Sequence, residues 1–211
     1  MKTTDLIDMM VQDDPAELPQ QRPLALWVTV LVVLSAAIVL LVGGLRADFA
    51  NVIVQPLVQA KYLLPLMVAV PSLWFASQAR QPETTLKGSL LWMAIPAVIV
   101  IALLISTWAN LPADKWAATV QGQSLFVCLA SIPLLASPIL AGLLWVMKQG
   151  ATTRPALAGA LAGLASGGLS ASVYALHCFE DSPAFYGVWY SAGIVLMGIA
   201  GQLIGSRVLK W

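Results

Sequence analysis

Residues 155–176 read PALAGALAGLASGGLSASVYAL, a run that contains no acidic or basic side chain. An α-helix rises about 1.5 Å per residue, so this run is long enough to cross the roughly 30 Å hydrocarbon layer of a bilayer. Five other apolar segments of similar length also lack charge. The predicted spans are approximately 24–45, 62–79, 88–109, 124–147, 155–176 and 185–206.

The composition is that of an integral membrane protein. Hydrophobic residues make up 59% of the chain and charged residues 10%, whereas soluble domains average about 25% charged residues. A β-barrel needs alternating apolar and polar residues, which these segments lack. The predicted fold class is therefore all-α, an integral membrane bundle of six transmembrane helices with short loops. Residues 1–23 form a head, and residues 24–211 form the membrane domain.

Lys and Arg predict the orientation of the bundle. Three cations fall on one side: Arg46, Lys61 and Lys115. The other side carries eight: Lys2, Arg22, Arg80, Lys87, Lys148, Arg154, Arg207 and Lys210. The richer side is expected to be cytoplasmic, because cytoplasmic loops carry an excess of Lys and Arg. Both termini are then cytoplasmic, and the protein is expected to be a multi-pass protein of a bacterial inner membrane.

Small residues recur every four positions in the last two spans. Gly159, Gly163 and Gly167 mark one stripe, and Gly201 and Gly205 mark another. Such stripes allow helix backbones to approach closely. We expect these two spans to pack against each other, with homodimerisation as the weaker alternative.

The head, MKTTDLIDMMVQDDPAELPQQRP, is acidic and contains one amphipathic stretch. Its apolar residues share one face of a predicted short helix, whose other face carries carboxylates. The residues concerned are Asp5, Leu6, Ile7, Asp8, Met10 and Val11. Two interpretations stay open from the residues alone: a segment that binds a basic partner protein, and an inert solvated tail.

The chain has two cysteines and a single histidine. Cys178 follows His177 in the polar segment HCFEDSP, and Cys128 lies about one turn inside the fourth span. The predicted topology puts both thiols at the outward end. Three interpretations fit: a disulfide, a soft-metal or redox sensor with His177, Glu180 and Asp181 as auxiliary ligands, or two ordinary apolar residues.

Catalytic motifs are absent from the sequence. It has no nucleophile elbow, phosphate-binding loop or HExxH pair, so no enzyme activity and no resident cofactor are predicted, apart from transient binding of a soft metal. Lys and Arg do not cluster as in nucleic-acid-binding proteins. The predicted spans contain no charged residue, which argues against an ion or proton pathway.

Three stretches resemble the NrsF family of six-span negative regulators of sigma factors. They are the opening TTDLIDMMVQD, the run GATTRPALAGALAGLASGGLSASVYALHCFEDSPAFYGVWY and the basic end RVLKW, of which YALHCFEDSP is the most specific. The resemblance implies an anti-sigma factor that holds an extracytoplasmic-function sigma factor at the membrane and releases it on a metal or oxidative signal.

On this resemblance the head contributes to sigma binding, and Cys128 and Cys178 are the sensor thiols. The alternatives are a small multi-span transporter or channel-like protein and a structural membrane subunit. The partners implied are the sigma factor and the lipid bilayer, without direct contact to nucleic acid.

Overall fold

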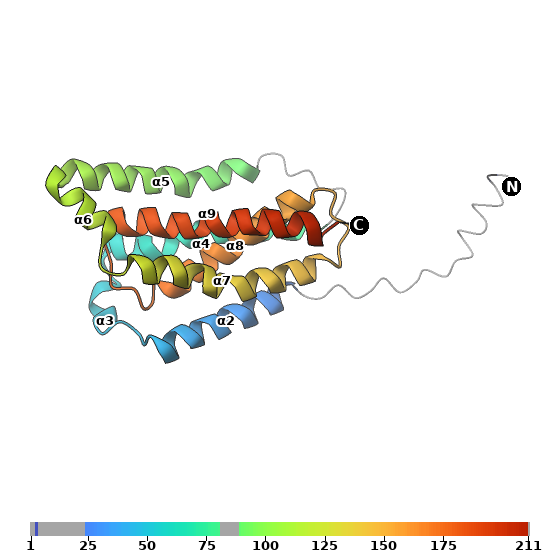
Figure 1. The fold of residues 1–211 in the computed structure, drawn as a ribbon, viewed down its shortest axis with the longest axis horizontal. Coiled ribbons are helices and arrows are strands. Elements are labelled where there is room, and N and C mark those ends of the chain that lie inside the picture. Colours follow the sequence, from blue (N-terminus) through green and yellow to red (C-terminus); the bar gives the residue numbers. More distant parts are fainter. Residues whose placement is uncertain (1–2, 4–23, 81–88, 211) are drawn as a thin grey trace.

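The computed structural model of the chain describes residue 3 and residues 24–80 and 89–210 (Figure 1). These residues form helices and no strand, and six helices are long and apolar enough to cross a membrane. The long helices are α2 (Leu24–Val42), α4 (Pro56–Gln78), α5 (Ser89–Asn110), α7 (Leu125–Met147), α8 (Pro155–Tyr174) and α9 (Pro183–Val208). The all-α six-span prediction is confirmed.

Short helices fill two of the connections. Between α2 and α4 lies α3 (Phe49–Val52), and between α5 and α7 lie the 3-10 turn Ala113–Lys115 and α6 (Trp116–Gln121). Several long helices also begin or end a few residues away from the predicted bounds. The largest shift is at α4, which starts at Pro56 instead of residue 62. This places Lys61 inside a membrane-spanning helix, so the expectation that no span contains a charge is wrong.

Helix α8 occupies the centre of the bundle. It packs against α2, α4, α7 and α9, and it is the most buried of the six long helices (Figure 1). None of its residues is exposed, as expected for a helix that presents no stripe to the lipid. Helix α5, in contrast, packs mainly against α4 and α9 and exposes large apolar residues such as Trp92 and Val98. We interpret this exposed face as lipid-facing.

Glycines allow the backbones of α8 and α9 to touch. A Cβ atom on Gly159 would collide with the carbonyl oxygen of Gly201, and one on Gly163 would collide with that of Met197. A Cβ on Gly205 would lie 2.6 Å from the Cα of Gly159. The two predicted stripes therefore face each other inside one chain. Gly167 continues this contact against Ile194.

Prolines lie inside α4, α5 and α7. At one of them, a side-chain hydroxyl replaces the backbone donor that the proline removes. Pro138 lacks an N–H, so the carbonyl of Leu134 loses its donor within the helix. The Ser137 hydroxyl donates a hydrogen bond to that carbonyl at 2.8 Å. A neighbouring side chain thus compensates for the proline, as helices in lipid require.

The bundle has two chemically distinct ends. The cysteine end carries all four acidic residues of the described chain, Asp48, Asp114, Glu180 and Asp181, together with Arg46, Lys61 and Lys115. The basic end carries five described cations and no described acid: Arg80, Lys148, Arg154, Arg207 and Lys210. The two ends are separated by the length of the spanning helices (Figure 1).

The glycine contact predicts a difference between two alanine substitutions. Gly163→Ala should lower the free energy of unfolding by about 2 kcal/mol, because backbone atoms of α9 must move. Gly198→Ala should cost less, because its Cβ would meet the flexible side chain of Leu164 at 2.9 Å. Thermal unfolding in detergent micelles measures the difference. Equal losses from the two variants would contradict backbone contact at Gly163.

Candidate functional site

The two cysteines are buried in one apolar cluster at the cysteine end. Cys128 lies in the first turn of α7 and is 0% exposed, and Cys178 lies just beyond α8 and is 2% exposed. Both are free thiols. Tyr174, Phe185 and Tyr190 belong to the same cluster. The fold therefore gathers two thiols that are fifty positions apart in the sequence.

A tight turn after α8 places Cys178 in this cluster. The backbone N–H groups of His177 and Cys178 both donate to the carbonyl oxygen of Tyr174, at 3.0 and 3.1 Å. The chain then continues through Glu180 and Asp181 to Ser182, where α9 begins. Cys178 thus lies at the turn between the central helix and its closest neighbour.

Lys61 holds this turn from α4. Its side chain is completely buried, and its ammonium group donates hydrogen bonds to the Cys178 carbonyl oxygen at 2.6 Å and to Asp181 Oδ1 at 3.1 Å. A buried charge is tolerated only when it is paired and hydrogen-bonded. The Lys61 ammonium therefore requires both the backbone of Cys178 and the carboxylate of Asp181.

Arg46 completes the ion cluster from the loop after α2. Its Nη1 and Nη2 atoms donate to the two carboxylate oxygens of Asp181 at 2.7 and 2.8 Å. Its Nε and Nη2 atoms donate to the two oxygens of Asp48 at 2.7 and 3.0 Å. Bidentate hydrogen bonds between arginine and a carboxylate are strong and directional. Arg46 thereby joins the loop after α2 to the loop before α9.

The cluster shifts the pKa values of Arg46, Asp48 and Asp181. The hydrogen bonds that Arg46 donates to Asp181 and Asp48 raise the pKa of Arg46, so the guanidinium stays charged. Burial tends to raise the pKa of Asp181, but the hydrogen bond from Arg46 and the charge of Lys61 outweigh burial and lower it. The hydrogen bond from Arg46 also lowers the pKa of Asp48. All of these groups are therefore charged at neutral pH.

His177 and Glu180 are engaged outside this ion cluster. The Nδ1 atom of His177 lies 3.1 Å from the carbonyl oxygen of Gly44, a glycine with a positive φ of 74°. Glu180 Oε1 accepts a hydrogen bond from the backbone N–H of Gln123 at 2.7 Å. These two contacts hold the 177–181 segment against two neighbouring loops.

The predicted ligands therefore do not form one metal site in this structure. Within residues 24–80 and 89–210, no group of three or more His, Cys, Asp or Glu side chains is placed to hold a metal ion. The thiols share a cluster, while His177, Glu180 and Asp181 each contact other groups. The predicted partner-binding residues Asp5, Leu6, Ile7, Asp8, Met10 and Val11 lie outside the described residues.

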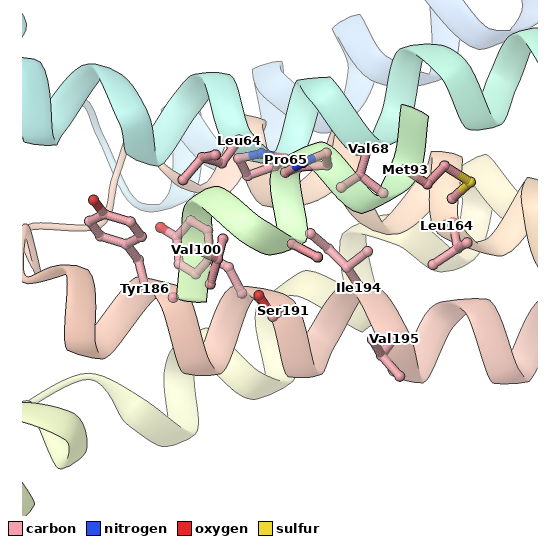
Figure 2. A pocket seen from close by; sticks show the side chains of 14 residues that line it. Leu64, Pro65, Val68, Met93, Val100, Leu164, Tyr186, Ser191, Ile194 and Val195 are labelled. Carbon is pink, nitrogen blue, oxygen red and sulfur yellow. The ribbon is translucent and has the colours of Figure 1, made fainter. Parts of the chain in front are cut away.

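A cavity of about 220 Å³ lies between α4, α5 and α9 (Figure 2). Leu64, Val68, Val100 and Ile194 are among the residues that line it, and none of its lining residues is charged. Tyr190 borders both this cavity and the cysteine cluster. The cavity therefore has an apolar wall and offers no evident path for an ion.

Comparison with known proteins shows the family. The family model described as "Negative regulator of sigma F" matches residues 12–211. The chain belongs to the NrsF family. An "Anti-sigma-F factor NrsF" from Caulobacter vibrioides is 28% identical over 214 residues, and a "Probable anti-sigma-F factor NrsF" from Azospira oryzae is 30% identical over 216. Both alignments cover the whole of each chain. No solved structure matches the chain.

The ion cluster of this NrsF-family protein was missed by the sequence analysis. There, Arg46 and Lys61 were used only as charges that predict the orientation of the bundle. Asp48 was not considered. One signal was available: Arg46 and Lys61 are cations on the side where positive charge is scarce, and each borders an apolar segment. Their common partner Asp181 is more than a hundred positions away, so pairing could not be inferred from spacing.

The cluster predicts an acid-sensitive contribution to stability. Asp181→Asn should lower the free energy of unfolding at pH 7 by about 3 kcal/mol, because Lys61 would stay buried without a carboxylate. The pKa of Asp181 is lowered in the folded state. The contribution is thus complete above the ordinary aspartate pKa of about 4, and it is lost as pH falls through the folded value.

Melting temperatures of the wild type and Asp181→Asn between pH 7 and pH 3 test this dependence. The difference in melting temperature between the two proteins should decrease as the pH falls. Glu180→Gln is the matched control, because Glu180 is outside the ion cluster. A gap that stays constant down to pH 3 would contradict the assignment.

Proposed function

We propose that this protein is a membrane-bound anti-sigma factor that holds an extracytoplasmic-function sigma factor and releases it on a metal or oxidative signal. The observation that carries the proposal is the family match over residues 12–211 together with two full-length relatives named as anti-sigma-F factors. The proposal goes beyond this family match in three respects: the class of sigma factor, the signal that releases it and the thiols that sense the signal.

The distribution of charge supports a sigma-binding surface at the basic end. Five described cations lie there without a described acid, and the positive-inside rule assigns such an end to the cytoplasm. The sigma factor acts on RNA polymerase and is therefore a cytoplasmic partner. The protein would lie in a bacterial inner membrane with both termini in the cytoplasm. The acidic head, with Leu6, Ile7, Met10 and Val11 as its apolar face, would add to this surface.

The cysteine end would then face outward and receive the signal at Cys128 and Cys178. Both thiols are buried in a close-packed cluster, so any added atom must displace its neighbours. Oxidation or binding of a soft metal ion would therefore favour a different packing of the surrounding helices. Neither thiol needs a third protein ligand for this effect.

Helix α4 connects the two ends. Lys61, near its start, is hydrogen-bonded to the Cys178 carbonyl, and Arg80 lies just after its end. A displacement of the Cys178 turn would therefore act on α4 through a contact between a buried charge and a carbonyl. A signal shifts the protein between two packings only by its difference in affinity for them.

The anti-sigma function predicts direct binding. The full-length protein in lipid nanodiscs should bind the purified sigma F of the same organism, and deletion of its gene should switch on a reporter that depends on that sigma factor. A silent reporter in the deletion strain, together with no binding in nanodiscs, would refute the anti-sigma function.

The sensor role predicts a separable effect of the thiols. Cys128→Ser with Cys178→Ser should preserve sigma binding but abolish reporter induction by an oxidant and by Cd²⁺. The control is Ser131→Ala, a change in the same helix outside the cysteine cluster. Full induction in the double variant would refute the sensor role and leave the anti-sigma function intact.

A further inference from the structure

Arg80 has an unusual position at the basic end. It follows the C-terminus of α4 and is only 9% exposed. Its Nε and Nη2 atoms are buried, and neither has a hydrogen-bond partner. Burial also lowers the pKa of this residue. Since a guanidinium remains charged in proteins, a buried charge without a partner is costly and calls for an explanation.

The backbone of Arg80, in contrast, is firmly held. Its carbonyl oxygen accepts a hydrogen bond from the N–H of Ala151 at 3.0 Å. A Cβ atom on Gly150 would lie 2.8 Å from both the Cβ and the carbonyl oxygen of Arg80. The loop between α7 and α8 therefore lies directly on this residue. The position of Arg80 is fixed, while two nitrogens of its guanidinium group, Nε and Nη2, are buried without a hydrogen-bond partner.

The same molecule shows what these two nitrogens can bind. Arg46 uses its own Nε and Nη2 atoms to hold the two oxygens of the Asp48 carboxylate. The Nε–Nη2 edge of a guanidinium is a two-pronged donor whose geometry fits a carboxylate. Arg80 presents the same edge without an acceptor.

No acid of the described chain is available to fill this edge. Asp48, Asp114, Glu180 and Asp181 all lie at the cysteine end, at the far side of the spanning helices. The other described charges of the basic end are all positive, from Lys148, Arg154, Arg207 and Lys210. The acceptor must therefore come from outside the described part of the chain.

We infer that Arg80 is a binding residue that receives a carboxylate of the bound sigma factor through its Nε–Nη2 edge. This inference rests on the proposed anti-sigma function. A protein carboxylate fits better than a lipid phosphate, because both nitrogens are buried and the residue as a whole is only 9% exposed. Binding requires the arginine side chain to turn outward or the covering residues to shift, so it is coupled to a small rearrangement at the end of α4.

Arg80→Gln tests the inference in full-length protein reconstituted in nanodiscs of phosphatidylcholine. Its dissociation constant for the sigma factor should rise about thirtyfold, because a charged hydrogen-bonded partner is lost. Arg80→Lys should not restore affinity, since an ammonium lacks the two-pronged edge. Lys115→Gln, an equal change of charge at an exposed residue of the cysteine end, should change affinity by less than about threefold.

Thermal stability separates binding from folding. Arg80→Gln should melt no lower than the wild type, because it removes an unpaired buried charge. A large fall in its melting temperature would show that Arg80 has a structural partner and would overturn the inference, as would unchanged affinity. If the wild type itself does not bind the sigma factor, the proposed function fails first.

Two further experiments identify the source of the group that binds Arg80. If Arg80→Gln weakens binding only in nanodiscs that contain phosphatidylglycerol, the ligand is a lipid phosphate and the inference is wrong. If its effect disappears in a protein whose own Glu83 and head acids are replaced by amides, the carboxylate belongs to this chain and the inference is also wrong. Persistence of the effect in both arms supports a carboxylate of the sigma factor.

Discussion

The structure of the cysteine end depends on the hydrogen bonds that the buried ammonium group of Lys61 donates. An unpaired charge in the interior of a membrane bundle is so costly that its partners must stay in place. Those partners are the carbonyl of Cys178 and the carboxylate of Asp181, and Asp181 in turn is held by Arg46. One charge therefore fixes the start of α4, the loop after α2 and the turn between α8 and α9.

This arrangement gives the bundle a rigid centre and a polarised exterior. Helices α8 and α9 are joined by backbone contact along their glycines, which leaves little freedom for relative movement without loss of packing. Helix α4 packs against α8, and it carries Lys61 near one end while Arg80 follows the other. It is thus the element through which a change at the cysteines would act on the basic end.

The two ends differ in how their charges are satisfied. At the cysteine end, Arg46 and Lys61 are neutralised by carboxylates of the same chain. At the basic end, the described cations have no described carboxylate nearby, and the Nε and Nη2 atoms of Arg80 are buried without a hydrogen-bond partner. Within the described residues, cations are paired with carboxylates at the cysteine end and not at the basic end, which suits a protein whose partner binds on one side only.

The sequence alone determined the class of fold, because six apolar segments of membrane-spanning length leave few other structures possible in a bilayer. It also pointed to the facing stripes of α8 and α9, since a four-residue glycine repeat is a local pattern. Pairing between distant segments has no such local signal. Lys61 was placed before a span, although helix α4 begins at Pro56 and buries it.

Only the tertiary structure decided which residues meet at the site. It brought Cys128 and Cys178 into one cluster and directed His177, Glu180 and Asp181 to three different partners. It also showed that the Nε and Nη2 atoms of Arg80 are buried without a hydrogen-bond partner. The physical reason is that period and composition determine which segments enter the membrane, whereas the energy of a buried charge depends on neighbours that are distant in the chain.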